Sequence, residues 1–117
     1  MGKSVFARGF IRELAQNEKL LVSSPTFLLE QEYTIPLCKM KIHHFDLYRF
    51  QTEMTQIDAK ALDWENSVKN DICLVEWAEK IKQPNYLPSQ WIGVEIKFSS
   101  KEKDEDRDLV ISLMRKN

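Results

Sequence analysis

The chain has 117 residues, 43% of them hydrophobic, which is the size and composition of one globular domain with its own core. Lys and Arg number 17 against 18 Asp and Glu, so a net charge of -1 excludes general coating of nucleic acid, and the short apolar runs exclude a membrane-spanning protein. Two cysteines, Cys38 and Cys73, have no CxxC spacing, so they suggest neither a cysteine zinc site nor a disulfide framework. We therefore expect a reducing, intracellular setting, cytoplasmic or organellar.

The first predicted element is an amphipathic helix over 3–17. Its apolar residues recur every four positions and share one face: Phe6, Phe10 and Leu14. On the same helix, Arg8 and Arg12 are expected to form an exposed stripe. No secretory signal precedes the helix, but the chain opens inside a motif, so targeting is not judged from this end.

Two strands are expected next. A polar, proline-marked connection over 23–26 leads into a strand over 27–33. In the segment 37–45 apolar residues alternate with lysines, which is the period of a half-buried strand, and Asp46 ends it.

A second helix and a buried strand follow. Four apolar residues at spacings of four, three and four predict one helical face: Ile57, Ala61, Trp64 and Val68. The continuous apolar run 72–75, ended by Glu76, is typical of a parallel strand buried on both faces. A helix between two such strands predicts a right-handed crossover.

The remaining segment predicts a β-hairpin. After a loop with two prolines, the segment 91–98 alternates apolar and polar residues, and 109–114 can pair with it. Between them, the charge run 101–108 is expected to be a solvated hairpin tip. No repeat or linker is visible, so one domain over 1–117 is expected.

Three residues at the start, Gly2-Lys3-Ser4, match the end of the P-loop pattern GxxxxGK[S/T] and open a helix. In such a loop, backbone amides cradle phosphates, the lysine reaches their oxygens and the serine hydroxyl binds Mg²⁺. A tripeptide alone is weak evidence, because any helix can begin this way.

Asp46 and Glu76 end two strands, and α/β folds gather ligand groups at the carboxyl ends of strands. Asp46 stands where a Walker B carboxylate belongs, or is a turn aspartate. Glu76 would orient or deprotonate an attacking water. Thr26 would sense the γ-phosphate as a switch residue, or only form a turn.

Four further side chains leave their roles open. Trp77 would stack on a nucleobase or cover the sheet edge. Arg49 would contact phosphate or pair with Asp46. His43 and His44 are neighbours on a strand, so their side chains point to opposite faces, which disfavours a zinc site built from both.

Together these motifs resemble the TsaE family, formerly called YjeE. The resemblance runs over nearly the whole chain and rests on four segments in order: Gly2-Lys3-Ser4 followed by FARG, SPTF at 24–27, HFDLYR at 44–49 and CLVEW at 73–77. It implies an α/β, P-loop NTPase-like fold, with a central sheet, flanking helices and a C-terminal β-hairpin. It also implies an ATPase of tRNA threonylcarbamoyladenosine biosynthesis that binds ATP and Mg²⁺, acts with TsaD and TsaB at adenosine 37, and reaches tRNA through them.

The resemblance also assigns roles to residues. It implies a nucleotide site formed by five of them: Gly2, Lys3, Ser4, Val5 and Trp77. Ser4 and Asp46 would organise Mg²⁺. Glu76 would assist hydrolysis, and Thr26 would belong to the switch loop.

The family places a strand and the first half of the P-loop before the Gly-Lys-Ser tripeptide, whereas here Met1 alone precedes Gly2. We therefore expect an N-terminally truncated chain, with ATP hydrolysis belonging to a longer parent. Two alternatives stay open. One is a nucleotide-incompetent subunit that docks on TsaD and TsaB, and the other is a small-molecule P-loop kinase.

Overall fold

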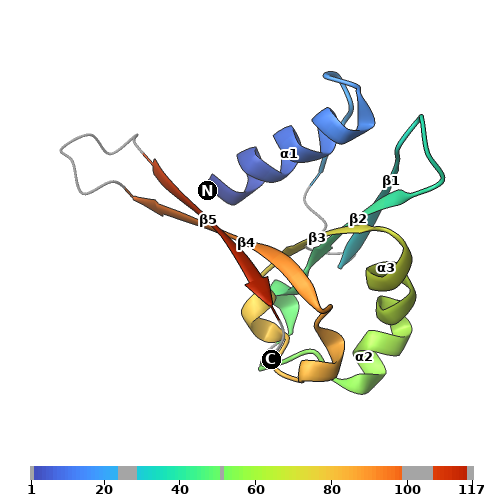
Figure 1. Ribbon diagram of the computed structural model, residues 1–117, viewed down its shortest axis with the longest axis vertical. Coiled ribbons are helices and arrows are strands. Elements are labelled where there is room, and N and C mark those ends of the chain that lie inside the picture. The colour runs from blue at the N-terminus through green and yellow to red at the C-terminus, as the bar shows by residue number, and fades with distance from the viewer. Residues whose placement is uncertain (1, 24–28, 51, 99–106, 116–117) are drawn as a thin grey trace.

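The computed structural model describes residues 2–23, 29–50, 52–98 and 107–115, which form a mixed α/β fold ending in a hairpin (Figure 1). In chain order the helices and strands are α1 (Gly2–Ala15), β1 (Glu30–Thr34), β2 (Lys41–Asp46), α2 (Gln56–Ala61), α3 (Trp64–Asn70), β3 (Ile72–Glu76), β4 (Gln90–Phe98) and β5 (Arg107–Arg115). Short 3-10 turns are η1 (Leu47–Arg49), η2 (Ala78–Lys80) and η3 (Pro84–Tyr86). None of the helices in these ranges has the length and apolar character to cross a membrane.

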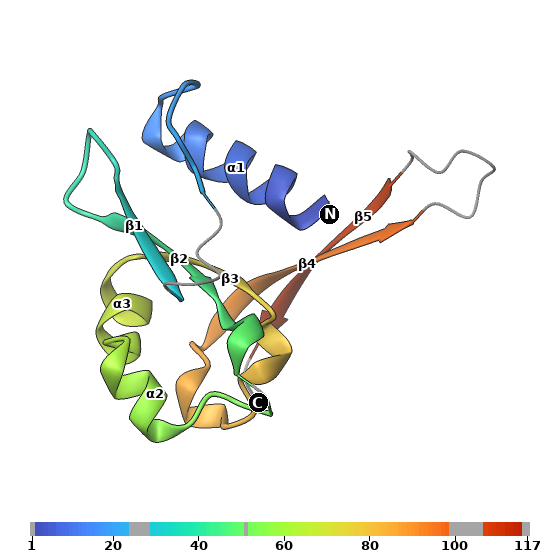
Figure 2. The same cartoon turned by 180° about the vertical axis from the view of Figure 1, so that it is seen from behind.

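A three-stranded sheet in the order β1-β2-β3 forms the centre of the fold. β1 pairs with β2 antiparallel. β2 pairs with β3 parallel, which is the pairing that the predicted crossover requires. Helix α1 lies on one side of this sheet, and α2 and α3 lie on the other (Figures 1 and 2). Both faces of β2 are therefore covered.

Burial follows this order and corrects two expectations. The prediction of a half-buried strand ending at Asp46 was wrong, because residues 42–46 of the central strand β2 are all buried. The apolar strand β3 is only half-buried along its length, so the prediction that 72–75 is buried on both faces was wrong. The reason is position, because β3 is an edge of the three-stranded sheet and β2 is its centre.

The observed bounds of the first two strands differ from the predicted ones. β1 is observed from Glu30, and part of the predicted strand 27–33 lies outside the described residues. β2 begins at Lys41, because the residues after Pro36 form a turn in which Cys38 N donates to Ile35 O at 3.4 Å. Leu37, predicted to be in the strand, is 82% exposed there.

Helix α1 forms where predicted, but its buried face is one residue away from the expected one. The most buried side chains on α1 share a row at spacings of four: Ala7, Ile11 and Ala15. Phe6 and Phe10 flank this row and stack on each other, with ring centroids 6.2 Å apart. Two alanines in the buried row let the helix backbone approach the sheet closely.

The predicted helix over 57–68 is two helices. Thr55 begins α2 with a capping box to Asp58, and Asp63 adopts a left-handed conformation at φ 53° that ends the first helix and starts α3. Because the helical phase restarts there, the expected single face is lost. Ile57 is 80% exposed, whereas Trp64 is 2% exposed.

The main core lies on the α3 side of the sheet. It holds six buried residues: Phe45, Leu47, Met54, Ala59, Trp64 and Tyr86. Phe45 and Trp64 pack at a centroid distance of 4.8 Å, and the Trp64 indole N–H donates to Tyr86 O at 2.9 Å. Trp64 thereby joins the sheet, α3 and the loop before β4.

Strands β4 and β5 form the predicted antiparallel hairpin, which projects from the rest of the fold (Figures 1 and 2). In its register Ile92 faces Leu113 and Val94 faces Ile111, so these aliphatic residues share one face. That face is exposed in this structure. The predicted charged tip at 101–108 falls mostly outside the described residues.

The Trp64 hydrogen bond gives a stability prediction. Trp64→Phe should lower the free energy of unfolding by about 1–3 kcal/mol, because Tyr86 O loses its buried donor. Ile57→Ala should change it by less than about 0.5 kcal/mol, because that side chain is exposed. Urea denaturation of both variants checks this contrast, and equal losses would contradict the two-helix arrangement.

Candidate functional site

The parallel pairing of β2 and β3 brings the two candidate acids together. Asp46 and Glu76 are register partners at the carboxyl ends of these strands. The prediction that both acids lie at one edge of the sheet is therefore confirmed. Ligand-binding crevices in α/β folds lie at such edges.

A cavity of about 210 Å³ opens beside Glu76, between α1 and the sheet. Its lining comes from the helix, the segment after it and the strand ends: Ser4, Ala7, Arg8, Val22, Ser23, His44 and Glu76. Ser4 and Glu76, which lie far apart in the sequence, therefore line one cavity. Arg8 adds a positive charge to its wall.

Glu76 is held by a histidine that the sequence analysis did not assign to this site. His44 Nε2 lies 2.6 Å from Glu76 Oε2, and the His44 residue is 2% exposed. Its buried Nδ1 has no hydrogen-bond partner among the described residues. Burial without a partner disfavours a proton on Nδ1, so we assign the proton to Nε2, which donates to Glu76.

Asp46 is buried, and its Oδ1 accepts a hydrogen bond from Tyr48 N at 3.0 Å. It thereby caps the short turn η1, which is the turn role left open by the sequence. The same bond fixes the carboxylate next to Glu76. A turn role and a ligand role are compatible at this position.

Lys3 and Trp77 meet at the N-terminal end of α1. The Lys3 ammonium lies 4.1 Å from the centroid of a Trp77 ring, a cation–π distance. Trp77 has a φ of 61°, and its ring packs 5.1 Å from that of Tyr48. The left-handed backbone at Trp77 turns the chain sharply after Glu76 and directs the indole toward α1.

The remaining predicted site residues differ in outcome. Gly2 is the first residue of α1, and the Val5 side chain is 65% exposed. Thr26 lies outside the described residues. The prediction that Arg8 and Arg12 form an exposed stripe was wrong, because both side chains are half-buried. Arg8 lines the cavity, and Arg12 Nε donates to Leu20 O at 2.9 Å.

His43 points to the opposite face of the sheet from His44, as the alternation predicted. Its Nδ1 lies 2.7 Å from Glu30 Oε2 on β1, and its Nε2 lies 2.8 Å from Asp71 Oδ2 just before β3. Burial opposes protonation of the ring, but the bonds to Asp71 and Glu30 outweigh it and raise the pKa of His43. The hydrogen bonds from His43 and from Lys41 N lower the pKa of Asp71. We call the set Glu30, His43 and Asp71 the sheet clasp.

The chain is similar to TsaE proteins over most of its length. The family model described as "Threonylcarbamoyl adenosine biosynthesis protein TsaE" matches residues 1–109. The chain is 31% identical over 111 residues to the tRNA threonylcarbamoyladenosine biosynthesis protein TsaE of Bacillus subtilis, covering 95% of this chain and 62% of that protein. It is 33% identical over 103 residues to the protein of that name from Rickettsia bellii, covering 88% and 66%.

A solved structure supports the fold. The crystal structure of Bacillus subtilis YdiB superposes with a TM-score of 0.57 at 24% identity, over 99% of this chain and 62% of that one. The predicted α/β fold class with a C-terminal hairpin is thereby confirmed. The chain spans 62% of the length of both the YdiB structure and the B. subtilis relative.

The sheet clasp predicts how stability depends on pH. Because the folded pKa of His43 is raised above 6.5, its contribution is fully present below that value and is lost as the pH rises through the folded pKa. The lowered pKa of Asp71 gives a contribution that is present above 3.8 and is lost as the pH falls through its folded pKa. The clasp therefore stabilises the fold most at mildly acidic pH.

The measurement is urea denaturation of the wild type and His43→Gln in buffer with a chelator. The difference in unfolding free energy between them should be larger at about pH 5.5 than at about pH 9. A difference that does not change with pH would show that the His43 bonds are made by a neutral ring.

Proposed function

The chain belongs to the TsaE family, and from this premise we propose that it is the ATP-binding and ATP-hydrolysing component of the machinery that makes threonylcarbamoyladenosine at adenosine 37 of tRNA. Its partners in this proposal are TsaD- and TsaB-type proteins. The observation that carries the proposal is that Ser4 and Glu76 line one cavity, with Lys3 beside them on Trp77. A P-loop serine and lysine and a strand-end carboxylate are the groups that phosphoryl transfer to water requires.

The N-terminus of α1 and Lys3 would bind the phosphates. A helix N-terminus presents unpaired amides, and Lys3 adds a positive charge in the first turn. To reach a phosphate, Lys3 would leave the Trp77 ring, a contact worth about 0.5–1 kcal/mol at an exposed site. A charged hydrogen bond to phosphate outweighs that loss.

The donor set fits Mg²⁺. A Ser4 hydroxyl and an Asp46 carboxylate are hard oxygen ligands of the kind that Mg²⁺ takes together with phosphate oxygens and water. When bound, the ion would neutralise charge on the transferring phosphoryl group. Tyr48 N would hold the Asp46 carboxylate in place for this role.

Glu76 would be the general base for the attacking water, and His44 would be its positioning residue. The 2.6 Å bond from His44 fixes one carboxylate oxygen and leaves the carboxylate oriented at the cavity wall. The carboxylate is then held in one orientation before the nucleotide arrives. Such preorganisation is a main source of catalytic power.

The charge balance supports indirect contact with tRNA. A net charge of -1 provides no broad basic surface for a phosphate backbone, so RNA would be reached through the partner proteins.

Loss of the Lys3 ammonium should remove nucleotide binding. Mg-ATP should change the fluorescence of Trp77 in the protein as its native cells produce it. The Lys3→Ala variant should lose that response. Lys19→Ala is the matched control, because Lys19 is an exposed lysine in the turn after α1. Trp77→Phe identifies the reporting indole, since Trp64 and Trp91 also fluoresce. An equal response in Lys3→Ala would contradict the phosphate assignment.

Loss of the Glu76 carboxylate should slow hydrolysis more than binding. Glu76→Gln should lower kcat for ATP hydrolysis by about 10²–10⁴-fold, the usual worth of a general base, while ATP binding is retained. Glu79→Gln, an exposed glutamate three positions further on, is the control. Phosphate release is the measurement, and an unchanged kcat would contradict the role of Glu76.

The same assays separate the alternative functions. Association with purified TsaD and TsaB without nucleotide binding would identify a docking subunit. Phosphate that appears on an added acceptor instead of in water would identify a kinase.

A further inference from the structure

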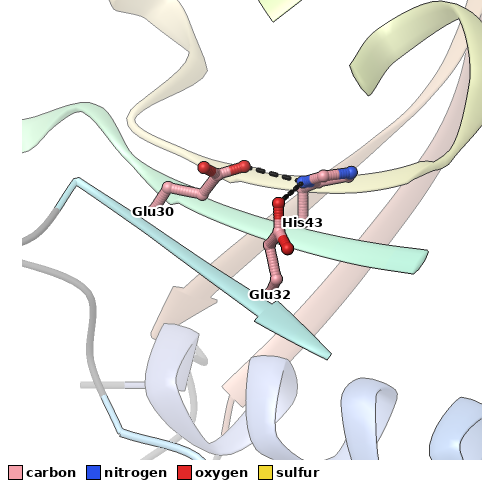
Figure 3. Close-up of side chains that lie close together, drawn as sticks. All are labelled: Glu30, Glu32 and His43. Carbon is pink, nitrogen blue, oxygen red and sulfur yellow. Dashed lines mark hydrogen bonds and ion pairs between the residues drawn. The ribbon is translucent and has the colours of Figure 1, made fainter. Parts of the chain in front are cut away.

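The side chains of Glu30, Glu32 and His43 converge on one point at the sheet (Figure 3). His43 Nδ1 lies 2.7 Å from Glu30 Oε2 and 3.6 Å from Glu32 Oε1. One donor atom from each residue lies within 4.8 Å of the other two, a spacing that a single metal ion can bridge. Both glutamates are on β1 two residues apart, so they share the face on which His43 lies.

Asp71 binds the ring nitrogen of His43 that lies away from the two glutamates. It accepts from His43 Nε2 at 2.8 Å, and it is itself fixed by a hydrogen bond from Lys41 N at 3.1 Å. The ring is also stacked on Phe45 at 5.9 Å and is 4% exposed. A carboxylate on the far nitrogen is the arrangement that orients a metal-binding imidazole and directs its other nitrogen to the ion.

The charges around His43 favour a second positive charge. Three carboxylates surround the ring, those of Glu30, Glu32 and Asp71, and Lys41 Nζ lies 3.7 Å from Glu32. With a protonated ring, one negative charge is in excess, and a divalent ion in place of the Nδ1 proton would balance it.

We propose that Glu30, Glu32 and His43 bind a divalent first-row transition ion such as Zn²⁺, with Asp71 as the outer hydrogen-bond acceptor. Imidazole nitrogen and carboxylate oxygen are both Zn²⁺ ligands, and three of them leave a further tetrahedral position for water. Binding releases the Nδ1 proton, while Nε2 keeps its proton and its bond to Asp71. The side chain of Glu32 is half-exposed, which gives the ion a path from solvent.

This site is distinct from the proposed Mg²⁺ position. His43 and His44 are on opposite faces of β2, and His44 is on the face with Ser4 and Glu76. The inference therefore does not rest on ATP binding. A bound ion would join β1 to β2 on the α3 side of the sheet.

The experiment titrates the protein with Zn²⁺ alone by calorimetry in a Cys38→Ser background, which removes an exposed thiol. We expect one ion per chain, proton release and tighter binding as the pH rises, because the proton and the ion compete for Nδ1. Asp71→Asn should weaken binding by about 10–100-fold, and Glu32→Gln by at least as much. Glu65→Gln, an exposed glutamate on α3, should leave the affinity unchanged.

Glu32→Gln is the decisive variant, because its half-exposed side chain can be changed without disturbing the core, whereas His43→Gln removes part of the sheet clasp. Cobalt absorption spectra identify the ligands. Nitrogen and oxygen coordination supports the site. Thiolate charge-transfer bands, an affinity unchanged in Glu32→Gln, or no Zn²⁺ binding would each overturn it.

Discussion

Strand β2 is tied to β3 from both faces of the sheet by two adjacent histidines, and the rest of the structure depends on this constraint. His43 bonds to Asp71 before β3 on the α3 face, and His44 bonds to Glu76 at its end on the α1 face. A slip of one residue would send each ring to the wrong face, break both bonds and carry Phe45 out of the core. The same register puts Asp46 beside Glu76. One pair of bonds thus fixes the sheet and the candidate site together.

Local patterns predicted the elements well, and failed where the outcome depends on distant contacts. The periodicity of α1 and the alternation of β4 were sufficient to place these two elements, and the strand-end acids to mark one sheet edge, because each is a property of a short segment. The periodicity did not identify the buried row of α1, which depends on how the helix packs on the sheet. The break at Asp63 was missed because a left-handed residue between two helical turns leaves no trace in the spacing of apolar residues. The central position of β2 was missed because burial depends on which strands flank it, and flanking strands come from elsewhere in the chain.

In the candidate site, too, local patterns identified some residues and missed those that depend on distant contacts. The tripeptide at Gly2 and the carboxylates at 46 and 76 could be found from the sequence, since strand ends and helix starts are visible in it. The bond between His44 and Glu76 spans 32 residues, and that between His43 and Asp71 spans 28. A histidine pair on a strand predicts only that the two rings separate. Their acidic partners are set by the register of the parallel pairing, which no local motif encodes.

The two cysteines differ in environment, with a practical consequence for chemical labelling. Cys73 is half-buried and its thiol stays protonated far above neutral pH, so it reacts slowly with alkylating reagents. Cys38 is exposed in the turn that joins β1 to β2. A maleimide dye or spin label would therefore attach selectively at Cys38 without mutagenesis. That position lets a spectroscopist follow the β1–β2 turn, next to the sheet clasp, in the unmodified sequence.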